Sequence, residues 1–140
     1  MRQAPGAQTE FAWQVRVYYE DTDRGGVVYY ANYLRFFERA RTEWLRALGI
    51  EHERLASAEG RGFVVARAEI DFRVGARLDD LLTVTVRPLE VQRASLWLGQ
   101  QARRADGRVC AEARIRVACV RLRDMRPQPL PATLRAELGA

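Results

Sequence analysis

The chain has 140 residues, 48% of them hydrophobic, and a net charge of +5. This length and composition exclude a disordered chain and predict one globular domain over residues 1–140, with a core that needs no disulfides or metals. With a single histidine, His52, and two cysteines, the sequence has almost no material for a Cys/His metal site or a Ser-His-Asp triad. Any chemistry must therefore rest on carboxylates, hydroxyls, arginines or backbone groups, without a metal or other cofactor.

The charge pattern and the N-terminal residues bear on partners and location. All 23 basic residues are arginines, and they are scattered along the chain rather than clustered, which argues against nucleic-acid binding. The first nine residues contain one arginine and no apolar run, so they do not resemble a signal peptide. No stretch of about 20 apolar residues occurs. The sequence thus predicts a soluble, cytoplasmic protein without a transmembrane segment.

The first predicted element is a strand over residues 13–19, in which apolar and polar residues alternate for most of its length. After a turn rich in Asp and Gly, apolar side chains recur at three- and four-residue steps: Tyr33, Phe36, Phe37, Ala40, Trp44 and Leu48. This periodicity predicts a helix with one apolar face that ends near Leu48, with Gly49 in its C-terminal cap. Residues 51–62 are expected to form a loop with room for a short helix.

Strand patterns dominate the second half of the chain, at residues 63–72, 81–86, 91–103 and 108–122. Pro88 predicts an edge position or a bulge at the end of the second of these strands. Asp106-Gly107 predicts a two-residue hairpin turn between the last two strands.

The last of these strands is longer than usual, so it is expected to curve. One of its faces carries small and apolar side chains: Val109, Ala111, Ala113, Ile115, Val117 and Cys119. Cys110 and Cys119 would lie about 30 Å apart along the strand, which excludes a disulfide within it and predicts two buried thiols. Residues 1–10 and 124–140 are expected to be peripheral tails.

The order of the predicted elements is β-α-β-β-β-β. A long helix with one apolar face must bury that face against another layer. The simplest arrangement is an α+β domain in which an antiparallel sheet of about five strands curls around the central helix. A single small sheet leaves an edge strand unpaired, which favours self-association.

The most informative segment is residues 18–33, where two aspartates and two glycines stand between the first strand and the helix. A helix N-terminus carries unpaired N–H groups and a partial positive charge, so it can hold an oxyanion. A carboxylate a few residues upstream could act as nucleophile or base on the same substrate group, which indicates acyl transfer. A calcium loop is excluded because Gly25 and Asn32 stand where it needs ligands. An aspartyl-phosphate phosphatase would need a β-α alternation that residues 63–122 lack.

This segment resembles the hotdog-fold acyl-CoA thioesterases. The resemblance is strongest to the Tol–Pal-associated thioesterase family and weaker to the 4-hydroxybenzoyl-CoA thioesterases, and it runs from about residue 15 to residue 131. The matching segments are residues 18–23 (YYEDTD), 25–29 (GGVVY), 32–34 (NYL), 37–43 (FERARTE) and 76–80 (ARLDD). The resemblance implies a hotdog fold and hydrolysis of an acyl-CoA thioester.

The resemblance assigns roles to individual residues. Asp23 is implied to be the catalytic carboxylate, acting as a nucleophile or as a general base on water. The backbone N–H of Tyr30 is implied to be the oxyanion donor, with Gly26 and Val28 in the same substrate-binding segment. Tyr30 stands where the Tol–Pal-associated members usually carry His and where the hydroxybenzoyl-CoA enzyme has Tyr. This departure suggests a preference for aromatic or bulkier acyl groups.

The resemblance also implies partners. Arg93 and Ser95 correspond to a segment that could contact the phosphates of CoA. The expected substrate is an acyl-CoA, or an acyl group on an acyl-carrier protein, and the expected assembly is a homodimer, often paired into a homotetramer, with sites at the subunit interface. Two alternatives remain open: a non-catalytic module that binds acyl thioesters or a partner of the cell envelope, and a 3-hydroxyacyl-thioester dehydratase. The dehydratase is disfavoured because such enzymes commonly use a histidine, and none lies near Asp23 in the sequence.

Overall fold

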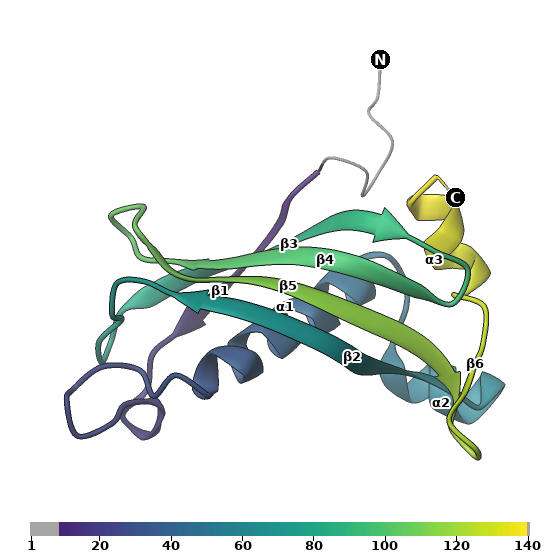
Figure 1. The fold of residues 1–140 in the computed structure, drawn as a ribbon, viewed down its shortest axis with the longest axis horizontal. Helices are drawn as coiled ribbons and strands as arrows, with labels where there is room; N and C mark the ends of the chain where they lie inside the picture. Colours follow the sequence, from purple (N-terminus) through teal and green to yellow (C-terminus); the bar gives the residue numbers. More distant parts are fainter. Residues whose placement is uncertain (1–8, 140) are drawn as a thin grey trace.

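The computed structural model describes residues 9–139. Its elements in chain order are β1 (Phe11–Arg16), the 3₁₀ turn η1 (Tyr19–Asp21), α1 (Asn32–Ala47), α2 (His52–Glu59), β2 (Arg61–Phe72), β3 (Leu81–Val91), β4 (Ser95–Arg103), β5 (Val109–Arg121), β6 (Arg126–Pro127) and α3 (Ala132–Glu137). Figure 1 shows α1 lying along one face of a curved sheet. The predicted α+β class, with an antiparallel sheet curled around one long helix, is confirmed.

The sheet has the strand order β1-β3-β4-β5-β2, and all of these pairs are antiparallel. These five strands match the predicted number, and the two-residue β6 adds a short pair with the end of β5. Within the described residues, β2 pairs only with β5, so one edge of this 12-residue strand is open. None of the helices in residues 9–139 has the length and apolar character needed to cross a bilayer.

The core lies between α1 and the sheet. The helix buries the side chains of Tyr33, Phe36, Phe37, Ala40, Trp44 and Leu45. The helix ends at Ala47, and Gly49 follows with a left-handed φ of 85°, which confirms the predicted C-terminal cap. Residues 52–59, expected as a loop with room for a short helix, form α2.

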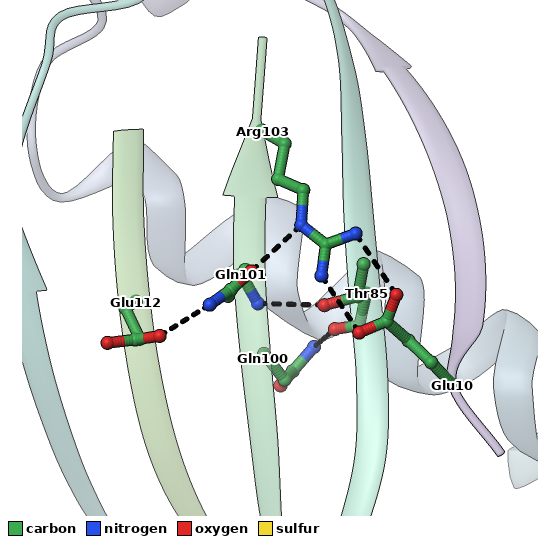
Figure 2. A network of polar contacts seen from close by, with 6 residues as sticks. All are labelled: Glu10, Thr85, Gln100, Gln101, Arg103 and Glu112. Carbon is green, nitrogen blue, oxygen red and sulfur yellow. Dashed lines mark hydrogen bonds and ion pairs between the residues drawn. The ribbon is translucent and has the colours of Figure 1, made fainter. Parts of the chain in front are cut away.

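The buried side chain of Gln100 ties α1 to the sheet. Figure 2 shows its contact with Thr85 beside neighbouring polar contacts of the sheet. Its Nε2 donates to the carbonyl oxygens of Phe37 (3.1 Å) and Thr85 (3.2 Å), and its Oε1 accepts a hydrogen bond from Arg41 (3.0 Å). Because the amide is satisfied on both ends, it holds one turn of the helix at a defined place over β3 and β4. This contact fixes the middle of α1 against the sheet.

Several strand boundaries differ from the predictions. β1 covers Phe11–Arg16 rather than residues 13–19, because Tyr19–Asp21 form the 3₁₀ turn η1. β2 begins at Arg61 rather than at residue 63. β3 runs through Pro88 to Val91, whereas the predicted strand ended at Val86 and Val91 was assigned to the next strand. The register shifts between Pro88 and Glu90, so the predicted bulge is confirmed. Pro88 lies beyond the last pair between β1 and β3, Phe11 with Val86, where β3 has a partner on one side only.

The hairpin between β4 and β5 is confirmed, but its predicted two-residue Asp-Gly turn is wrong. The Gly107 N–H donates to the carbonyl of Arg104, and the Arg104 N–H donates to the carbonyl of Arg108, both at 2.9 Å. The turn is therefore centred on Ala105 and Asp106, and Gly107 follows it with φ of 87°. This is a type I turn with a left-handed residue after it, which is the common form of the slightly longer hairpin loop.

Both cysteines are buried free thiols, as predicted. The register of β5 against β4 shifts at the end of the pair, where Ala102 faces Ala111 but Arg103 faces Val109. The bulge leaves Cys110 as the extra residue, 1% exposed, while Val109 is only half-buried. The expectation that Val109 continues the buried face is therefore wrong, because strict alternation ends at a bulge.

The C-terminal residues pack more closely than a peripheral tail would. Leu130 and Leu134 are fully buried and Leu138 is 7% exposed, all within the main core cluster. The apolar pattern of residues 124–140 did not predict this burial, because three prolines interrupt it. At the other end, residues 1–8 of the expected N-terminal tail lie outside the described residues. Glu10 forms a two-pronged ion pair with Arg103 on β4.

Candidate active site

Asp23 opens a tight turn over residues 23–26, between η1 and α1. Its carbonyl accepts the Gly26 N–H (3.0 Å), its N–H donates to the Val27 carbonyl (2.8 Å), and its Oδ1 accepts the Gly25 N–H (2.8 Å). Gly26 has φ of 79°, which explains the need for glycine at this position. The Asp23 side chain is exposed, and its Oδ2 has no hydrogen-bond donor among the described residues. One carboxylate oxygen is thus oriented by the turn, and the other is free.

Asp21, the second aspartate of the motif, supports the loop. It is 6% exposed, and its Oδ2 accepts the Tyr18 N–H at 2.8 Å. Its carbonyl oxygen accepts both the Tyr29 N–H and the side-chain amide of Asn32, each at 2.9 Å. These contacts join the end of η1 to the first residue of α1, so Asp21 fixes the distance between the turn and the helix.

The N-terminus of α1 has no side-chain cap. The N–H groups of Asn32, Tyr33 and Leu34 donate to carbonyls three residues earlier, at 2.8 to 3.2 Å. The N–H groups of Tyr30 and Ala31 have no acceptor among the described residues. Two backbone donors at the positive end of the helix dipole are therefore available to an oxyanion.

The predicted residues Gly26 and Val28 have different positions in this loop. The Gly26 N–H closes the Asp23 turn, as described above. Val28 is 5% exposed, and its N–H donates to the Ala76 carbonyl at 2.8 Å. Its side chain belongs to the core and its N–H is occupied, so Val28 anchors the loop to the segment before β3.

An exposed aromatic cluster surrounds Tyr30. Its ring lies 4.9 Å from that of Tyr29 and 5.7 Å, edge-on, from that of Phe72 at the end of β2. Phe72 also contacts the buried ring of Tyr33 at 5.8 Å. The neighbouring Tyr30 side chain raises the pKa of Tyr29 above its usual value, so this phenol stays protonated near pH 7. Apolar surface therefore adjoins the free amides of the helix end.

Arg93 and Ser95 do not join Asp23 within one chain. The Asp23 loop contacts the segment just before β3, whereas both of these residues follow β3, which has 11 residues. At about 3.3 Å per residue they lie roughly 30 Å away. Figure 1 likewise shows the loop before α1 at one end of the sheet and α2, β6 and α3 at the other. The Ser95 hydroxyl is buried and donates to the Gln92 side chain (3.0 Å), and Arg93 is exposed.

Arg77 is a further residue of this site that sequence reasoning did not single out. It forms an isolated antiparallel bridge with Val27, which brings the segment before β3 against the Asp23 loop. A Cβ atom at Gly26 would lie 3.9 Å from Arg77 Nη1, so the guanidinium passes close to that glycine. Residues 76–80 resemble the thioesterase family in sequence, which could have drawn attention to Arg77. Their spacing from Asp23 in the sequence, however, does not show that the two segments lie side by side.

An apolar cavity of about 130 Å³ lies elsewhere, between α1, β2 and α3, and Trp44, Phe63 and Leu134 are among its lining residues. Within residues 9–139, no group of three or more His, Cys, Asp or Glu side chains is placed to hold a metal ion. The single histidine, His52, is exposed on α2 with its ring against Phe63.

A long helix held against one face of a curved antiparallel sheet is the architecture of the hotdog-fold proteins. The model of the Thioesterase-like superfamily matches residues 17–138, and the chain belongs to this superfamily. The recognition of a hotdog thioesterase from the sequence is thereby confirmed.

Curated relatives and a solved structure agree with this assignment. The chain is 46% identical over 126 residues to the "Acyl-CoA thioesterase YbgC" of Haemophilus influenzae, covering 90% of this chain and 92% of that protein. It is 43% identical over 129 residues to the "Acyl-CoA thioester hydrolase YbgC" of Escherichia coli O6:H1, covering 92% and 96%. A probable thioesterase from Bartonella henselae superposes with a TM-score of 0.84 at 36% identity, covering 88% of this chain and all of that one (100%).

Proposed function

We propose that this protein hydrolyses an acyl-CoA thioester to a free acid and CoA at the Asp23 loop. The observation that carries the proposal is the pairing of an exposed, turn-oriented carboxylate with unoccupied backbone donors at Tyr30 and Ala31. The names of the relatives at 43% and 46% identity support the substrate class.

In the proposed reaction the thioester carbonyl oxygen accepts a hydrogen bond from the Tyr30 N–H. Asp23 either attacks the carbonyl carbon itself or removes a proton from the water molecule that attacks it. In the first case an anhydride forms, the CoA thiolate leaves, and water then cleaves the anhydride. In the second case the tetrahedral intermediate collapses directly and expels the thiolate, which takes up a proton.

The chemistry fits a site without a triad. One preorganised oxyanion donor contributes about 3 kcal/mol to lowering an acyl-transfer barrier. A thiol has a pKa of about 8.5, so its thiolate is a good leaving group and departs without protonation by a strong general acid. A dehydratase would need a paired acid and base, and the single histidine of the chain lies on α2 rather than beside Asp23.

We further propose that the working unit is a homodimer or homotetramer. The open edge of β2 supports this, and two apolar side chains on that strand, Val65 and Phe72, are 50% and 48% exposed. Arg93 and Ser95 lie too far from Asp23 in the same chain to share one CoA molecule with it. They can meet the substrate only if a second copy of the chain contributes them.

Thiol release from a panel of acyl-CoAs tests the function. Asp23→Asn keeps the size of the side chain but removes the carboxylate, and we expect a loss of roughly 10²-fold or more in kcat. Glu20→Gln is the matched control, because it neutralises an exposed carboxylate of the same loop. Binding of CoA esters without turnover would instead favour the non-catalytic module. Equal rates for the wild type and Asp23→Asn would exclude Asp23 as the catalytic residue.

A further inference from the structure

Arg77 is held beside the Asp23 turn by backbone contacts. The bridge between Val27 and Arg77 and the hydrogen bond from the Val28 N–H to the Ala76 carbonyl join the two segments directly. On its own side, the Arg77 N–H donates to Asp80 Oδ2 at 2.9 Å, which closes the turn that leads into β3. The position of the Arg77 backbone is therefore determined by the same loop that carries Asp23.

The two glycines of the motif contribute no side chain to the space between the carboxylate and the guanidinium. A Cβ atom at Gly25 would lie 3.2 Å from Asp23 Oδ1, and one at Gly26 would lie 3.9 Å from Arg77 Nη1. Since consecutive Cα atoms are about 3.8 Å apart, these contacts place Asp23 Oδ1 and Arg77 Nη1 at most about 14 Å from each other. No side chain of the intervening residues fills this path, because both are glycines.

The guanidinium of Arg77 is free to bind a ligand. Among residues 9–139 it has no hydrogen-bond acceptor and no carboxylate within ion-pair distance, and the residue is exposed. The neighbouring Arg104 differs, since it donates to Asp106 at 2.8 Å and to the Gly75 carbonyl at 3.4 Å. Arg16 is likewise occupied by the Asp79 carbonyl at 2.7 Å. A guanidinium with unused donors therefore lies within about 14 Å of the Asp23 carboxylate.

We propose that Arg77 binds the pantetheine arm of the substrate by donating hydrogen bonds to an amide carbonyl of that arm. This inference rests on the proposed function, in which the thioester lies at Asp23. An extended chain advances about 1.2 Å per bond, so the amide carbonyls of the arm lie within about 10 Å of the sulfur, and the phosphate at its far end lies about 16 Å away. The limit of about 14 Å between Asp23 and Arg77 favours an amide over the phosphate. The same arm occurs in CoA and in acyl-carrier protein, so the contact would serve either carrier.

The test compares one acyl group on three thiols: CoA, pantetheine without phosphate, and ethanethiol without either amide. Arg77→Met removes the guanidinium while keeping an aliphatic side chain, and Arg123→Met, at an exposed turn after β5, is the matched control. We expect Arg77→Met to lower kcat/KM about 10- to 100-fold for the CoA and pantetheine esters alike, the range for a hydrogen bond to a charged group. The ethanethiol ester should be hydrolysed at the wild-type rate by both variants.

Three results would overturn the proposal. A loss with the CoA ester alone would show that Arg77 contacts a phosphate. An equal loss with all three esters would show that Arg77 supports the loop, and no loss at all would show that it has no part in binding. A wild type that hydrolyses none of the esters contradicts the proposed function instead. Calorimetric binding of acyl-pantetheine to the wild type and to Arg77→Met tests the contact without turnover: we expect weaker binding by the variant, and equal affinities would overturn the proposal.

Discussion

The backbone at Gly26 allows a sharp test of the candidate site. Gly26→Ala places a side chain at φ of 79°, a left-handed conformation that costs an L-residue about 1–2 kcal/mol. The added Cβ atom would meet Arg77 Nη1 at 3.9 Å, an ordinary contact, so no clash adds to this cost. We therefore expect the free energy of unfolding to fall by about 1–2 kcal/mol through backbone strain alone.

Gly107→Ala is the matched control, because Gly107 has φ of 87° and nothing lies within 4 Å of its Cβ position. Both variants should lose similar stability in urea unfolding at equal protein concentration. Only Gly26→Ala should also lose activity, since relief of the strain moves the Asp23 turn. A displacement of about 1 Å at a reacting group costs up to about 10²-fold in rate. The reasoning fails if Gly26→Ala unfolds like the control but keeps full kcat/KM, or if Gly107→Ala loses activity to the same extent.

Three further predictions concern the core. Gln100→Leu leaves Arg41 without its acceptor, so the free energy of unfolding should fall by about 1–3 kcal/mol. An unchanged free energy of unfolding in urea would contradict the role of Gln100 in tying the helix to the sheet. Leu134→Ala should cost about 2–5 kcal/mol, because this side chain is fully buried, whereas a true tail residue would cost nothing measurable. Burial raises the pKa of Cys110 and of Cys119, so the folded protein keeps these protons after the unfolded chain releases them. Stability should therefore be complete below a pH of about 8.5 and decline above it, and replacing both cysteines by alanine should flatten that decline in unfolding curves measured across this range.

Local patterns were sufficient for the main elements. The apolar steps from Tyr33 to Trp44 predict a helix because residues three and four apart share one face whatever surrounds them. The turn at Asp23 is local in the same sense, since its hydrogen bonds join residues at most four apart. Gly26 signals the left-handed conformation by its identity alone. The class of fold follows from these elements, because an amphipathic helix must be covered by another layer and the remaining predicted elements are strands.

Features that depend on pairing across the chain were beyond such patterns. The extension of β3 to Val91 and the bulge at Cys110 depend on register with β4, which the sequence of one strand does not contain. The burial of Leu134 depends on where the proline-rich segment returns to the core.

For the candidate site, the carboxylate, the glycines and the helix start could be predicted from local sequence, because these lie within a few residues of one another. That Val28 is an anchor with an occupied N–H, and that Arg93 and Ser95 lie at the far end of the sheet, became clear from the folded chain. It also brought Arg77 against Gly26, through a bridge between residues remote in sequence. Each of these features depends on contacts between distant residues, which form only when the whole chain buries its apolar surface, so no short segment of the sequence specifies them.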